Sequence, residues 1–232
     1  MNMIKKLFMI MLCGLFTFGL VTPIQASGEG CIDCLFEEES YVNPDYNSVA
    51  NGNGIEMIPY ATTRNLAVGN LYQTTSENSG VQLLNCSSDT IYSSGCALTS
   101  FAMVLNYLKG TSYSPKQVNA TLKPYMSCLM LWNTADDVYG LTLVLNEVNS
   151  SGLSASYYNQ EIYTQIMSGR PVIVGFIKAN GVQHFVVVKG LNYSGSTYTF
   201  YINDPNSYNS YTTLNQWVSA GATITRIVAY DF

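Results

Sequence analysis

A cysteine, a histidine and an aspartate follow one another along the chain in an order that thiol chemistry can use. They are Cys96, His184 and Asp204. A thiol that attacks a carbonyl needs a base to take its proton, and the base needs a third group to fix its tautomer. His184 is the only histidine, so a mechanism that requires an imidazole must use it. The competing interpretations are that Cys96 is a small core residue and that His184 is a hydrogen-bonded residue on an apolar strand face.

The segment from Cys96 to Gly110 predicts the helix that positions the thiol. Gly110 supplies the left-handed end of this helix. The apolar side chains that recur at helical spacing are Leu98, Phe101, Ala102, Leu105 and Leu108. A helix that begins at or just before Cys96 presents the thiol to unbonded backbone N–H groups and to the positive end of the helix dipole. Both favour the thiolate, which is the nucleophilic form.

The remaining elements predict an α+β domain with its helices first and an antiparallel sheet afterwards. Ser114 followed by Pro115 is typical of a helix start. Further helices are predicted over 115–122, 134–139, 141–149, 160–168 and 214–219. Strands are predicted over 171–177, 183–189, 197–202 and 224–230.

Three regions of different composition divide the 232 residues. Residues 1–26 have two lysines, an apolar run and a small residue at the expected cleavage point, which predicts a signal peptide. Residues 27–60 carry seven acidic and no basic residues, and are interpreted as a flexible leader, either a solvated linker or a removable pro-segment. Residues 61–232 form the predicted folded domain. They have eight charges of each sign, which gives no basic surface for nucleic acid, and no apolar run long enough for a membrane span.

The cysteines agree with an extracellular or cell-surface location. Five lie outside the predicted signal peptide, an odd number for an oxidising compartment. If Cys96 is the free thiol, the other four can form two disulfides in three ways. The predicted pairs are Cys31 with Cys34 in the leader and Cys86 with Cys128 in the domain. A zinc site built from the same four cysteines is the alternative.

Three motifs together resemble the papain-like cysteine peptidases of the double-glycine, bacteriocin-processing type, and specifically their stand-alone secreted relatives. The motifs are 94–100 with 102–105, 169–172 continuing to 184–188, and 203–205. The resemblance covers about residues 71–230. It implies a papain-like fold in which the nucleophile helix packs on the antiparallel sheet. It also implies Cys96 as nucleophile, His184 as general base and acid, and Asp204 as the group that orients His184, with Asn203 as the rival for that last role.

The resemblance also implies a glutamine shortly before the cysteine, which stabilises the oxyanion together with the N–H of the cysteine. The chain departs from this pattern, because Thr90 stands six residues before Cys96. Gln73 is the predicted replacement, and Gln82 and Asp89 are the alternatives. A second, milder departure is alanine at position 97, where many relatives have glycine.

The resulting prediction is a secreted cysteine peptidase that hydrolyses peptide bonds through a thioester acyl-enzyme. Its partner is a peptide or protein substrate, and no cofactor, metal ion or nucleic acid is predicted. The alternatives are a cell-wall amidase or endopeptidase on the same fold, and a non-catalytic secreted binding protein.

Overall fold

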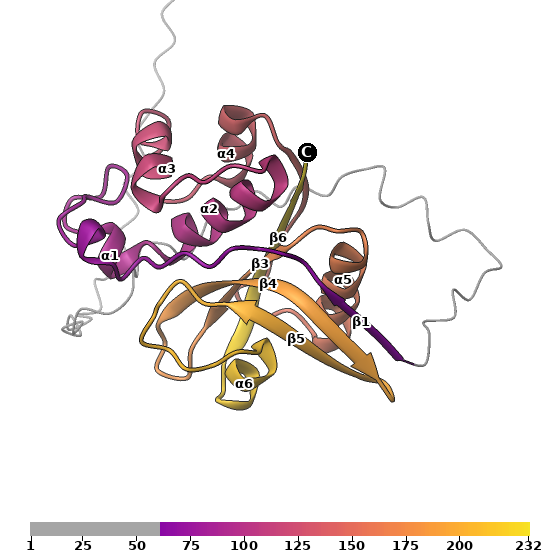
Figure 1. The fold of residues 1–232 in the computed structure, drawn as a ribbon. Coiled ribbons are helices and arrows are strands. Elements are labelled where there is room, and N and C mark those ends of the chain that lie inside the picture. The colour runs from indigo at the N-terminus through magenta and orange to yellow at the C-terminus, as the bar shows by residue number, and fades with distance from the viewer. Residues whose placement is uncertain (1–60) are drawn as a thin grey trace, which may run out of the picture.

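An antiparallel sheet of six strands carries the fold in the computed structural model, which describes residues 61–232 (Figure 1). The strands are β1 (Ala61–Asn65), β2 (Thr142–Val148), β3 (Val172–Ile177), β4 (Gln183–Ser194), β5 (Thr197–Asn203) and β6 (Thr223–Asp231). Their order is β1-β4-β3-β6-β2, with β5 paired to β4, and every pair is antiparallel. The predicted signal peptide and leader, including Cys31 and Cys34, lie outside the described residues.

Six α-helices of the described region pack around this sheet. They are α1 (Ile91–Ser94), α2 (Cys96–Lys109), α3 (Pro115–Leu122), α4 (Trp132–Tyr139), α5 (Ala155–Met167) and α6 (Leu214–Ser219), with a 3-10 turn η3 (Ser76–Asn78) before α1. Figure 1 shows α1 to α4 gathered on one side of the sheet, while α6 lies on the other side beside β5. The α+β class, with a helical group packed on an antiparallel sheet, is therefore confirmed.

Helix α2 begins at Cys96, as its apolar spacing predicts. Gly95 is required before it, because a Cβ there would lie 2.4 Å from the carbonyl oxygen of Ile91. At the other end Gly110 has φ 63°, the left-handed conformation that stops the helix and that glycine adopts without a steric penalty. The two glycines thus fix where the helix starts and where it ends.

The core lies between α2 and the central strands. Phe101, Val104 and Leu105 of α2 are fully buried, and the helix contacts β3 and β4. Residues Val172 to Phe176 of β3 are all buried, so both faces of this strand are covered. This burial of apolar side chains stabilises the position of α2 on the sheet.

One predicted helix is wrong. The segment 141–149 contains β2 (Thr142–Val148), which pairs with β6 from Thr142 opposite Asp231 to Val148 opposite Arg226. The apolar residues of this stretch fit a helical period as well as a strand, and its β-branched residues favour the strand once β6 offers its hydrogen-bonding edge. Tertiary pairing therefore decides the structure of this segment.

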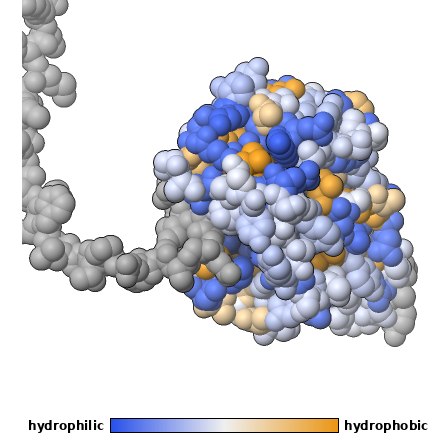
Figure 2. Space-filling view, turned by 60° about the vertical axis from the view of Figure 1, so that its left-hand side comes forward, coloured by the Kyte–Doolittle hydropathy of each residue, from blue (hydrophilic) through white to orange (hydrophobic). Residues whose placement is uncertain are grey.

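On the face in Figure 2, hydrophobic areas are small and are separated by hydrophilic ones. Within residues 61–232, no helix combines the length and the apolar character needed to cross a bilayer.

Candidate active site

The antiparallel topology brings the three predicted residues to one place. Asn203, at the end of β5, is opposite Val187 of β4, so the chain leaving β5 runs past the first residues of β4. His184 is the second residue of β4, and Asp204 is the first residue after β5. Helix α2 packs on β4 and β3, which brings Cys96 to the same end of the sheet.

His184 lies between the other two residues and bonds to both. Its Nε2 is 2.8 Å from Oδ1 of Asp204, and the two side chains are only about 5% exposed. The imidazole also makes a side-chain hydrogen bond with Cys96. Because Nε2 faces the carboxylate, Nδ1 is the nitrogen left for the sulfur. Cys96 itself is a free thiol of intermediate exposure.

These contacts make the imidazole strongly basic. Burial by itself lowers the pKa of His184, but the hydrogen bonds to Asp204 and Cys96 and the charges of both groups outweigh it and raise the pKa to about 9. At neutral pH the site therefore holds an imidazolium between a carboxylate and a thiol group. Such a group can hold a thiolate and can donate a proton to a leaving group.

Aromatic side chains enclose the imidazole. The ring centroid of Phe176, directly opposite in β3, is 5.5 Å from that of His184, and the centroid of Trp217 from α6 is 5.6 Å away. Tyr211 packs edge-on against Trp217 at 4.8 Å. These rings exclude water from the hydrogen bond between His184 and Asp204, which strengthens it.

Asn203 faces elsewhere. Its Nδ2 donates to the carbonyl oxygen of Val68 at 2.9 Å, and its side chain is buried there. Successive residues of a strand point to opposite faces, so Asn203 and Asp204 cannot both face the histidine. Asp204 is the one that bonds to it.

Gln73 lies between the approach to Cys96 and the loop after Asp204. Its Nε2 donates to the carbonyl oxygen of Tyr92, four residues before Cys96, at 3.1 Å. Its backbone N–H donates to the carbonyl oxygen of Pro205 at 2.8 Å, and the side chain is 4% exposed. An amide nitrogen carries two hydrogens, so this group has a second donor in addition to the bond with Tyr92.

The two alternatives to Gln73 are engaged in other contacts. Gln82 accepts a hydrogen bond from Lys123 at 2.7 Å. Asp89 accepts one from the hydroxyl of Ser94 at 2.6 Å and thereby ties the start of α1 to its end. Neither residue has a described contact with His184 or Cys96.

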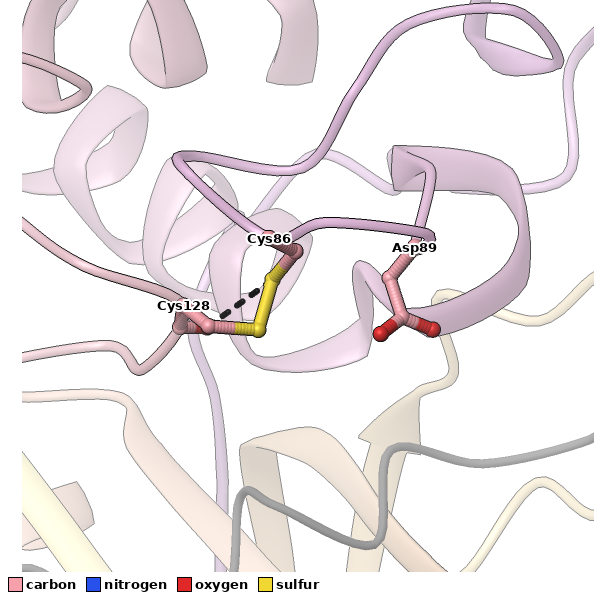
Figure 3. Close-up of side chains that lie close together, drawn as sticks. All are labelled: Cys86, Asp89 and Cys128. Atoms are coloured by element: carbon pink, nitrogen blue, oxygen red, sulfur yellow. Dashed lines mark hydrogen bonds between the residues drawn. A yellow bond between two sulfur atoms is a disulfide. The ribbon is translucent and has the colours of Figure 1, made fainter.

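Cys86 and Cys128 form the predicted disulfide, which closes a sequence separation of 42 residues. The Asp89 carboxylate lies beside it (Figure 3), and one ligand atom from each of the three residues lies within 4.8 Å of the others. Both sulfurs are used in the disulfide and are not thiolates, so this group is not a metal site in the oxidised protein. The zinc site from four cysteines is incompatible with this pairing.

Two contributors to the site were not expected from the sequence. Asn209 donates from Nδ2 to Oδ2 of Asp204 at 3.0 Å, and Trp217 covers the imidazole. The sequence offers a weak signal for the tryptophan, a large aromatic residue on the predicted helix 214–219. It offers none for Asn209, which stands in a loop rich in asparagine and serine.

Comparison with known proteins identifies the family of the chain. The model of the Peptidase_C39 like family matches residues 65–224, which is more than half of the chain and includes Cys96, His184, Asp204, Gln73 and Asn209. No curated protein matches the chain. The match confirms the resemblance to a papain-like cysteine peptidase family that the motifs indicated.

Proposed function

Because the chain belongs to the Peptidase_C39 like family, we propose that it is an active cysteine peptidase that hydrolyses peptide bonds. The observation that supports this most is the buried His184, which bonds to Cys96 and Asp204 together and whose pKa is raised to about 9. A buried imidazole has two ring nitrogens that need partners, and here the two partners are a carboxylate and a thiol, the groups that nucleophilic catalysis by a cysteine requires.

The proposed reaction uses each of these groups once in each half of the cycle. The sulfur of Cys96 attacks the substrate carbonyl carbon, and the carbonyl electron pair moves to the oxygen. His184 gives its proton to the leaving amine, the C–N bond breaks and a thioester forms. His184 then takes a proton from water, whose oxygen attacks the thioester carbon, and the thiolate leaves. Asp204 keeps Nε2 protonated and the ring oriented throughout.

Gln73 is the proposed oxyanion donor, together with the backbone N–H of Cys96. The second N–H of the Gln73 amide is the donor for this role, and the bond to Tyr92 fixes its orientation near the start of α2. Removing one such donor lowers kcat by about 100-fold to 1,000-fold in acyl-transfer enzymes. The variant Gln73→Ala should show a loss of this order with little change in KM.

We further propose that the enzyme acts outside the cytoplasm. The support is the signal-like sequence of residues 1–26 and the disulfide between Cys86 and Cys128, which is compatible with an oxidising compartment. Residues 27–60 are then the leader of the secreted form, and 61–232 its peptidase domain. A protein that starts near residue 61 and is no more active than one that starts at Ser27 would contradict a pro-segment role for the leader.

The proposed activity is tested with a mixed peptide library, followed by mass spectrometry of the products. The secreted protein is compared with Cys96→Ala, which removes the nucleophile and leaves His184 and Asp204 in place. New peptide termini with the wild type and none with the variant are expected. Equal cleavage by both proteins, or none by either, would contradict the proposal. Cell-wall peptide is included as a further substrate to test the amidase or endopeptidase alternative. Cleavage of the wall peptide without cleavage of the library peptides would favour that alternative.

A further inference from the structure

Both carboxylate oxygens of Asp204 accept hydrogen bonds, and His184 is a partner of only one of them. Its Oδ1 accepts from His184 Nε2 and from the backbone N–H of Asn206, each at 2.8 Å. Its Oδ2 accepts from Nδ2 of Asn209 at 3.0 Å. The same Asn209 nitrogen is 3.4 Å from His184 Nε2. Asn209 therefore lies against both members of the buried pair.

The loop between β5 and α6 that carries Asn209 (Figure 1) is itself fixed by hydrogen bonds. The backbone N–H of Asn209 donates to the carbonyl oxygen of Asn206 at 3.1 Å, and the N–H of Tyr208 donates to Oδ1 of Asn206 at 3.0 Å. The hydroxyl of Ser207 is 2.7 Å from that of Thr74. Because the loop is fixed in this way, the Asn209 amide needs little ordering to meet the carboxylate.

We propose that Asn209 is a positioning residue of the Cys96–His184–Asp204 site, an inference that rests on the proposed function. A carboxylate can turn about its Cβ–Cγ bond, and a donor on Oδ2 restrains this rotation and keeps Oδ1 at the imidazole. The amide nitrogen has no lone pair available to accept, so it does not compete with Asp204 for the Nε2 proton of His184. Asn209 thus acts on the reaction by holding Asp204, and its contact with His184 brings no competing acceptor to Nε2.

The test measures the rate at which limiting iodoacetamide alkylates Cys96, mapped by mass spectrometry with disulfides intact, as a function of pH. The variants are Asn209→Ala, the isosteric Asn209→Asp and the loop control Ser207→Ala, with circular dichroism to verify that each is folded. Near pH 6, Asn209→Ala should slow labelling by about tenfold, the lower end of what a hydrogen bond to a charged group contributes. Ser207→Ala loses only its hydroxyl contact with Thr74 and keeps the backbone hydrogen bonds that fix the loop, from Ser207 N–H to Thr74 Oγ1 and from Asn209 N–H to Asn206, so its rate should be unchanged.

Asn209→Asp separates a positioning role from a structural one. Near pH 5 the introduced carboxyl is partly protonated and can donate to Oδ2 of Asp204, whereas near pH 8 two carboxylates face each other and repel. Its rate relative to Asn209→Ala should therefore fall as pH rises. Among the described residues, His184 from β4 is the titratable group that contacts the side chains at positions 204 and 209, and Cys96 from α2 bonds to the other side of its ring. Beyond the imidazole, Lys178 and Tyr211 contact Trp217.

A double-variant cycle completes the test. In the Asp204→Ala background, Asn209→Ala should change the labelling rate by less than about twofold, because the group through which it acts is gone. If Asn209→Ala slows labelling in the Asp204→Ala background as much as it does in the wild type, the positioning role is wrong. The same holds if Ser207→Ala slows labelling as much as Asn209→Ala does. Wild-type labelling that does not depend on His184 would overturn the proposed function itself. A normal wild-type profile with an unchanged Asn209→Ala rate would overturn only the role of Asn209.

Discussion

The protonation of His184 can be measured directly, because the chain contains no other histidine. In a tag-free protein a long-range 1H–15N spectrum has one imidazole to follow between about pH 5 and pH 10. The wild type should titrate near pH 9, the value to which Asp204 and Cys96 raise the pKa against the effect of burial. Relative to the ordinary value of 6.5, this corresponds to about 3 kcal/mol in favour of the imidazolium.

Two variants divide this stabilisation between its sources. Asp204→Asn removes the larger raising contribution and leaves the ring buried between Phe176 and Trp217, so the pKa should fall well below that of the wild type. Cys96→Ser removes the smaller contribution and keeps the carboxylate, so its pKa should lie between those of the other two proteins. In the neutral form the 15N shifts should show the proton on Nε2, the nitrogen that faces Asp204.

Two results would refute this reasoning. A wild-type imidazole that titrates at or below pH 6.5 would mean that burial outweighs the carboxylate and that the site rests with a neutral ring. A larger fall in Cys96→Ser than in Asp204→Asn would mean that the thiolate, not the aspartate, holds the proton on the ring.

Three further predictions concern stability, each measured by urea unfolding. The pKa of His184 is about 9 in the folded state and 6.5 in the unfolded state. Protonation of His184 should therefore add up to about 3 kcal/mol to the free energy of unfolding below pH 6.5, and this contribution should be lost as pH rises through 9. The variant His184→Gln should remove this dependence of the unfolding free energy on pH. Reducing the Cys86–Cys128 disulfide should cost about 4 kcal/mol by loop entropy, and an unchanged midpoint would contradict this. Gly95→Ala should cost about 1–3 kcal/mol because of the clash with α1, whereas Gly80→Ala, with open space around it, should be neutral.

Much of the fold is predictable where local signals and tertiary packing agree. The α2 helix has an apolar face and a glycine at each end, and α3 has serine and proline at its start, so both follow from local preference. The helix ending at Met167 is predicted but begins earlier, at Ala155, because Ser154 caps it. Strand β2 is missed because its apolar residues fit two periods and only its pairing with β6 decides between them.

The candidate site also contains residues that the sequence predicts and one that it does not. Cys96, His184 and Asp204 are recognisable because few residue types can do thiol chemistry and the chain offers only one histidine. The pairing of Cys86 with Cys128 agrees with the expectation that cysteines of one folded domain bond to each other. Asn209 is not recognisable, because its contact with Asp204 depends on how the loop folds back, and no periodic pattern in the sequence records that path.

The central claim is that Cys96 and His184 form an activated pair, and the pH dependence of Cys96 alkylation tests it most directly. The wild type and His184→Ala are treated with limiting iodoacetamide, and the label on Cys96 is quantified at each pH. We expect rapid labelling of the wild type well below about pH 8, with labelling in the variant slower or moved to higher pH. Slow labelling with the same pH profile in both proteins would contradict it and would favour a binding protein on a peptidase fold.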